Sequence, residues 1–88
     1  MRAVIQHLTD GELRTRIEAK LVSGVLSWDL PQGTLGGPSS GQRCSGCDEA
    51  IAAAEAEIES ERHDAPPQYF HVRCYRLLRA ARESRTRL

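Results

Sequence analysis

The sequence predicts a small α+β protein, and three observations support this prediction. The chain has 88 residues, of which 40% are hydrophobic, with one Trp, one Phe and two Tyr. Such a chain can bury only a small apolar core. Its hydrophobic period is that of a helix near the N-terminus, that of a strand in the middle and that of a helix again at the C-terminus. Its three cysteines and one histidine form two short motifs, Cys44-Ser45-Gly46-Cys47 and His71-Val72-Arg73-Cys74.

These two motifs predict one tetrahedral metal site. Two side chains three residues apart, in a tight turn or in the first turn of a helix, can reach the same ion. Three thiolates and one imidazole form a structural zinc set that leaves no coordination position for a substrate. A segment of about 45 residues cannot build a sufficient core, so we expect one structural Zn²⁺ to supply folding energy. The predicted ligands are Cys44, Cys47, His71 and Cys74; His63 would be the substitute for His71, reaching in from a hairpin tip.

Residues 9–23 are predicted to form an amphipathic helix. Thr9 and Glu12 have the spacing of a capping box, in which each satisfies a backbone amide of the other. Gly24 fits a left-handed helix end. Apolar side chains share one face at four-residue spacing, namely Leu13, Ile17 and Leu21. Two uses of this face fit the pattern: packing on the protein's own domain, and dimerisation or docking of a partner.

A segment rich in glycine, proline and serine, residues 31–42, is predicted to be a linker. It would separate an N-terminal helical arm, residues 1–30, from a zinc finger with a C-terminal helix, residues 43–88. Trp28 is expected to anchor the end of the arm on the core, the other interpretation being an exposed docking aromatic.

The zinc-binding segment is predicted to contain a knuckle, a β-hairpin and a helix. Gly46 would use a positive φ to turn backbone amides toward sulfur. Residues 54–61 alternate, with glutamate at every odd position, which favours a strand with one solvated face. A helix over residues 48–62 stays open as an alternative, because Ala and Glu are good helix formers. Residues 64–67 would break the chain, and residues 68–70 would form the second strand.

From His71 onward the period is helical, and both downstream ligands are expected in the first turn. One face would carry His71, Cys74, Tyr75, Leu78 and Ala81, and the opposite face would carry Arg73, Arg76 and Arg79. The arginine face is either a solvated surface that neutralises the acidic hairpin and the zinc–thiolate centre, or a contact surface for nucleic acid or a protein partner.

The order of knuckle, hairpin and helix resembles a treble-clef zinc finger. The strings Cys-Ser-Gly-Cys-Asp-Glu-Ala-Ile and Phe-His-Val-Arg-Cys-Tyr resemble the first zinc module of LIM domains. They also resemble the poly(ADP-ribose) polymerase-type finger, which recognises DNA breaks. The whole chain is similar to small uncharacterised bacterial zinc-finger proteins. The chain departs from a LIM domain because no second ligand set follows Cys74, and from a DNA-break finger because an acidic hairpin would repel phosphates.

Charge is unevenly distributed although the net charge is zero. Residues 48–64 contain seven acidic residues against one arginine, whereas residues 71–88 contain six arginines against one glutamate. Opposed blocks of this kind satisfy each other inside the fold or across a self-association interface. They weaken an argument for nucleic acid from global charge.

We expect a cytoplasmic protein, because no segment suits a membrane span or secretory signal and the cysteines have metal-ligand spacing. Redox catalysis by Cys44 and Cys47 would need a parallel-sheet pattern, and zinc hydrolysis would need an open coordination position. We therefore predict a non-enzymatic structural-zinc module that binds an unknown protein partner or forms a homodimer. The alternative is a nucleic-acid-binding finger that uses the arginine-rich helix.

Overall fold

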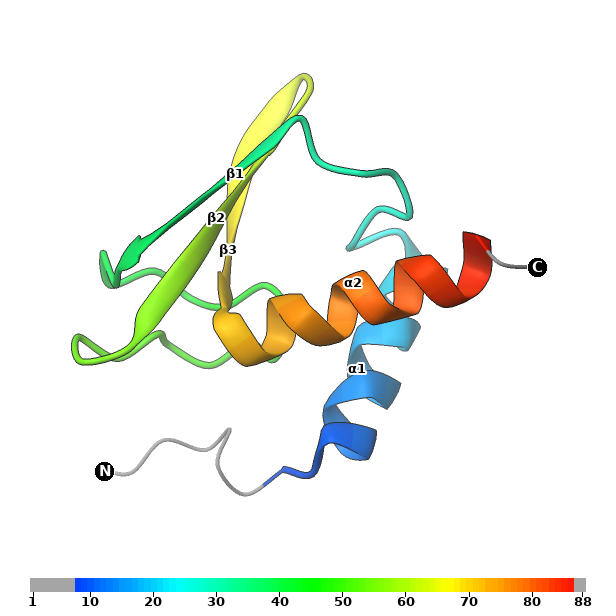
Figure 1. The fold of residues 1–88 in the computed structure, drawn as a ribbon, viewed down its shortest axis with the longest axis horizontal. Coiled ribbons are helices and arrows are strands. Elements are labelled where there is room, and N and C mark those ends of the chain that lie inside the picture. The colour runs from blue at the N-terminus through cyan, green and yellow to red at the C-terminus, as the bar shows by residue number, and fades with distance from the viewer. Residues whose placement is uncertain (1–7, 87–88) are drawn as a thin grey trace.

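A computed structural model describes residues 8–86, and residues 1–7 and 87–88 lie outside that description. The chain forms, in order, α1 (Asp10–Ser23), β1 (Gly33–Pro38), β2 (Ala56–Arg62), β3 (Ala65–His71) and α2 (Val72–Thr86). The strands make one antiparallel sheet in the order β1-β2-β3, α2 leaves the end of β3, and α1 packs against α2 (Figure 1). The predicted α+β class is confirmed. Within residues 8–86, no helix combines the length and apolar character that a membrane crossing requires.

The capping box at the start of α1 is confirmed. The Glu12 amide donates to Thr9 Oγ1 at 3.1 Å, and the Thr9 amide donates to Glu12 Oε1 at 2.8 Å. Gly24 ends the helix in the left-handed region with a φ of 89°. The three apolar side chains at four-residue spacing are all buried, so local capping and hydrophobic period together define this element.

The apolar face of α1 packs on the protein's own domain. Its buried leucine and isoleucine side chains belong to one core cluster with Leu26, Phe70, Leu78 and the three cysteines. Arg73 of α2 reinforces the contact, because its Nε donates to Asp10 Oδ1 at 2.8 Å and its Nη2 donates to the Leu8 carbonyl at 2.6 Å. Trp28 is partly buried against the same core, as expected.

The linker predicted over residues 31–42 differs from the structure, where its middle is strand β1. Its register against β2 runs from Gly33 opposite Glu61 to Pro38 opposite Ala56. The reason is that a β ladder is made by backbone amides and carbonyls, and β2 provides them whatever the side chains of β1 are. Pairing with β2 therefore outweighs the weak strand propensity of the residues in β1.

The hairpin is confirmed as β2 and β3, and the helix over residues 48–62 is excluded. The turn lies at His63 and Asp64, where Asp64 has a φ of 55°. Residues 65–67, expected to break the chain, instead begin β3. Prolines are tolerated there because β3 is an edge strand.

The prediction that the glutamates of β2 form a solvated face is wrong at Glu57. Only 7% of this residue is exposed, and its carboxylate accepts hydrogen bonds from the amide and the hydroxyl of Ser40 at 3.0–3.1 Å. A buried carboxylate is stable when hydrogen bonds satisfy it. Glu57 therefore fixes the segment that leads from β1 into the knuckle.

Candidate metal centre

The structure brings the four predicted ligands together. The Sγ atoms of Cys44, Cys47 and Cys74 and one ring nitrogen of His71 all lie within 4.8 Å of one another. All three cysteines are fully buried, and His71 is 4% exposed. Tetrahedral zinc with three sulfurs and one nitrogen places its ligand atoms about 3.5–3.8 Å apart. The four donor atoms thus fit one metal ion.

Three elements deliver these ligands. Cys44 and Cys47 lie in the knuckle between β1 and β2, and Cys74 lies in the first turn of α2. His71 was expected in that same turn, but it is the last residue of β3, where it still pairs with Glu57. The ladder holds the histidine backbone extended, and the helix begins one residue later.

Backbone hydrogen bonds shape the knuckle. The Cys44 amide donates to the Glu49 carbonyl at 2.8 Å, and the Asp48 amide donates to the Cys44 carbonyl at 2.9 Å. The Cys44 sulfur accepts from the amides of Gly46 and His71 at 3.3 and 3.4 Å. Amides that point at a thiolate stabilise its charge and orient it toward the metal.

Gly46 has a different role from the one predicted. The positive φ of the knuckle falls on Asp48, at 71°, and not on Gly46. A Cβ added to Gly46 would lie 3.0 Å from the Cys74 Cβ and 3.6 Å from the sulfurs of Cys44 and Cys74. Glycine is needed because the knuckle and α2 approach each other closely here.

Hydrogen bonds among the three cysteines shift their pKa values in opposite directions. Hydrogen bonds from Cys47 and Cys74 hold the pKa of Cys44 well below its usual range. Hydrogen bonding to Cys44 raises the pKa of Cys47 to about 11, and hydrogen bonding to Cys44 and Cys47, followed by burial, raises the pKa of Cys74. A cluster that holds protons in this way must release them when a cation takes their place.

A carboxylate lies near the second ring nitrogen of the histidine, without a hydrogen bond to it. His71 Nδ1 lies 3.4 Å from the Cys47 sulfur, and His71 Nε2 faces Glu55 Oε1 at 3.5 Å. Glu55 is held by Ala52, whose amide donates to Oε1 at 2.8 Å and whose carbonyl accepts from the Glu55 amide at 2.9 Å. A carboxylate at Nε2 favours the tautomer with its proton there, which leaves the Nδ1 lone pair for a metal.

Helix α1 contributes a cation to the knuckle. Lys20 Nζ donates to the Ser45 carbonyl at 2.9 Å and to Asp48 Oδ1 at 2.7 Å. Sequence reasoning did not find Lys20 or Glu55 as site residues. Local patterns do not reveal these contacts, because Lys20 and Ser45 are 25 residues apart and Glu55 and His71 are 16 residues apart.

The predicted arginine face is divided among different roles. Arg73 is bound to the start of α1, as described above, and only Arg76 and Arg79 of the three are exposed. Of the arginines further along, Arg82 is 8% exposed and donates to the Ser27 carbonyl. Burial lowers the pKa of Arg82, and the Arg85 guanidinium lies 4.4 Å from the Trp28 ring centroid.

The substitute ligand His63 is exposed at the hairpin turn, outside the cluster.

The fold and the site define a small α+β domain whose buried Cys₃His cluster can hold one metal ion. Comparison with protein-family models, curated proteins and solved structures finds no match. The resemblance to LIM and poly(ADP-ribose) polymerase-type fingers therefore stays a prediction.

Proposed function

We propose that this protein is a non-enzymatic interaction module built on one structural Zn²⁺. The observation that carries the proposal is the full burial of three cysteine sulfurs beside a buried histidine ring at ligand distance. Free cysteines are often buried as small hydrophobic residues, but three thiols and an imidazole whose donor atoms converge within 4.8 Å suit a shared metal ion. Cys44, Cys47, His71 and Cys74 are the proposed ligands.

The donor set supports zinc as the metal. Thiolates select zinc, copper(I) or iron–sulfur chemistry, and a single ion with three sulfurs and one imidazole suits tetrahedral zinc. Three thiolates would give the centre a net charge of about −1, and Lys20 is placed to offset it. The free thiols support a reducing compartment, and we propose the cytoplasm.

A structural role fits the coordination better than catalysis does. Four protein ligands complete a tetrahedron, so no position is left for a water or a substrate. The order of knuckle, hairpin and ligand-bearing helix supports kinship with treble-clef fingers. We accordingly propose that the surface, not the metal, acts by binding a protein partner or a second copy.

Nucleic-acid binding through α2 has less support. The arginine face of α2 is reduced to Arg76 and Arg79, because Arg73 is hydrogen-bonded to the start of α1. Titration with short duplex and single-stranded DNA at low and moderate salt tests it. A steep salt dependence that disappears in the Arg76→Ala/Arg79→Ala variant would establish this alternative.

The metal is tested by elemental analysis of natively purified protein and by Cys47→Ser. We expect about one equivalent of zinc, and we expect the variant to lose dispersed amide signals, because a structural site supplies folding energy directly. Ser45→Ala, which changes a neighbouring side chain that is not a ligand, should retain both metal and fold. A folded protein without bound metal would refute the proposal.

A further inference from the structure

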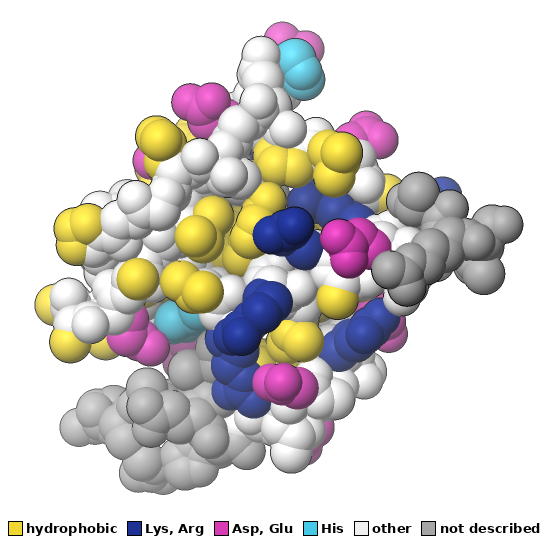
Figure 2. Space-filling view, in the orientation of Figure 1, with side chains coloured by type: hydrophobic (Ala, Val, Ile, Leu, Met, Phe, Trp, Pro, Cys, Tyr) yellow, Lys and Arg dark blue, Asp and Glu magenta, His cyan; other side chains and the backbone are white. Residues whose placement is uncertain are grey.

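A groove lies between the sheet and the outer side of α2. It is lined by Thr34 of β1, Ile58 of β2 and, on α2, Val72, Tyr75, Arg76 and Arg79, and it encloses about 400 Å³. The groove exists because the sheet diverges from the helix: α2 contacts β2 and β3, whereas β1 contacts only β2 among the described elements. Figure 2 shows hydrophobic side chains gathered over this region, with basic side chains next to them.

The floor of the groove is apolar and fixed. Ile58 is partly buried, and 44% of Val72 is exposed. The Tyr75 ring is held against Phe70, with the ring centroids 5.5 Å apart and the planes at 57°. Because Phe70 is itself in the core, Tyr75 does not need to be ordered when a ligand arrives. An apolar surface that is already ordered costs less entropy to cover.

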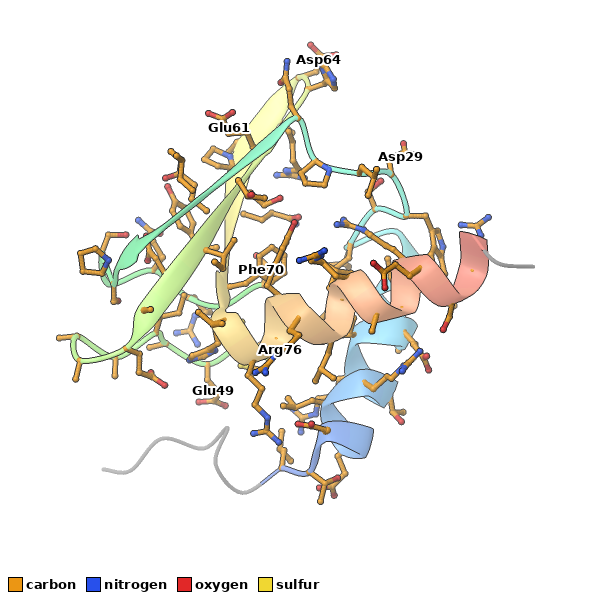
Figure 3. The ribbon with its side chains drawn as sticks, viewed as in Figure 1. Asp29, Glu49, Glu61, Asp64, Phe70 and Arg76 are labelled. Atoms are coloured by element: carbon orange, nitrogen blue, oxygen red, sulfur yellow. The ribbon has the colours of Figure 1, made fainter. Side chains whose placement is uncertain are left out.

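The rim of the groove is positively charged. Arg76 and Arg79 are exposed, and neither forms an ion pair within residues 8–86. Glu83 lines a neighbouring hollow on α2 together with both arginines, but it forms no ion pair with either of them. The glutamates of β2 do not neutralise them. Glu59 pairs with Leu35 and Tyr69, so its side chain points to the sheet face opposite that of Ile58 and Phe70. Figure 3 likewise shows Glu61 projecting from the sheet away from α2, and Arg76 on the helix.

We propose that this β1–α2 groove binds a segment of a partner protein that carries an apolar side chain followed by carboxylates. The apolar side chain would cover Ile58 and Val72, and the carboxylates would pair with Arg76 and Arg79. Nucleic acid fits less well, because phosphates would satisfy the arginines and leave the apolar floor without a partner. This inference rests on the proposed function, since it names the partner class of that interaction module.

The test uses the full zinc-loaded chain and a panel of synthetic peptides of about ten residues. Each peptide has one Leu, Ile or Phe followed by several Glu or Asp, and matched panels replace the acidic residues with Lys or the apolar residue with Ser. Binding is followed by amide shifts in ¹⁵N-labelled protein. We expect saturable shifts at Thr34, Ile58, Val72 and Tyr75 with the acidic panel alone.

Charge reversal provides the matched variants. Arg76→Glu/Arg79→Glu should weaken binding of the acidic peptides by at least about tenfold, because attraction at the rim becomes repulsion. Arg16→Glu is the control: Arg16 is also an exposed helical arginine, but it lies on α1 and does not line the groove. The Arg16→Glu variant should bind the acidic peptides with the same affinity as the unmodified chain.

Four results would overturn the inference: no groove shifts at millimolar peptide, equal binding of the Lys panel, the same shifts produced more strongly by duplex DNA, or a concentration-dependent dimer with these amides at its interface. Zinc content and amide dispersion are measured on the same sample. A folded protein with one equivalent of zinc and no peptide binding defeats the groove inference alone. A folded protein without zinc defeats the proposed function instead.

Discussion

Removing the charge of Glu55 tests whether the carboxylate beside the histidine tunes the metal site. Glu55→Gln keeps the side-chain length and the oxygen that accepts from the Ala52 amide, but it removes the negative charge 3.5 Å from His71 Nε2. Glu55→Ala removes both functions. Glu59→Gln is the matched control, because Glu59 also lies in the acidic segment but on β2, at a position whose partners in the sheet are Leu35 and Tyr69.

The geometry sets the size of the effect. Loss of an outer hydrogen-bonding partner of a metal ligand typically lowers metal affinity 10–100-fold, about 1.4–2.7 kcal/mol. Glu55 Oε1 lies 3.5 Å from Nε2 without a hydrogen bond, and the Glu55 side chain is 33% exposed, so the interaction is electrostatic and water screens part of it. We therefore expect about a tenfold loss for Glu55→Gln, near the lower end of that range, and a larger loss for Glu55→Ala.

The assay is competition for zinc against a chromophoric chelator near neutral pH, with ¹⁵N NMR of the His71 ring as a second measurement. Zinc on Nδ1 leaves the ring proton on Nε2 in the wild type and in the variants alike, and the variants should show a shifted, faster-exchanging Nε2 proton signal. If both variants bind zinc as tightly as Glu59→Gln and keep the ring signal, Glu55 does not support the ligand.

Three further changes test how the helices and the knuckle fit together. Lys20→Met removes two hydrogen bonds to the knuckle from a lysine whose side chain is 17% exposed. We expect a loss of about 1–2 kcal/mol in urea unfolding of the zinc-loaded protein, and an unchanged midpoint would contradict it. Gly46→Ala places a methyl group 3.0 Å from the Cys74 Cβ, so zinc affinity and thermal stability should both fall, by about 1–3 kcal/mol in unfolding; a variant with unaltered melting would show that the knuckle can yield. Ile17→Ala empties a fully buried site and should cost about 2–5 kcal/mol, whereas Val22→Ala, at a position 82% exposed on the same helix, should change stability by less than about 0.5 kcal/mol.

Local patterns predicted the parts of the fold whose causes are local. The capping box and the glycine stop of α1 depend on groups within a few residues, so the sequence contains all that determines them. The same holds for the buried face of α2, which follows from a period of 3.6 residues. The ligand set was also predictable, because a metal requires pairs of ligands at short, fixed spacing.

Contacts between distant segments were beyond the reach of such patterns. Strand β1 has the composition of a linker and becomes a strand only because β2 offers it a row of backbone partners. Glu55, Glu57 and Glu59 are indistinguishable in the alternating sequence. In the structure, however, Glu57 is buried and accepts from Ser40, whereas Glu55 faces His71. Arg73 belongs to the same arginine face of α2 as Arg76, but its side chain is hydrogen-bonded to the start of α1.

The sequence by itself therefore determined the helices, the hairpin and the four side chains that can hold a metal, because each rests on a short-range geometric rule. Tertiary structure alone decided which charged residues serve the centre, which join the helices and which stay exposed at the groove. Charged side chains have the same local pattern in all three roles, and only the position of a partner far along the chain distinguishes them.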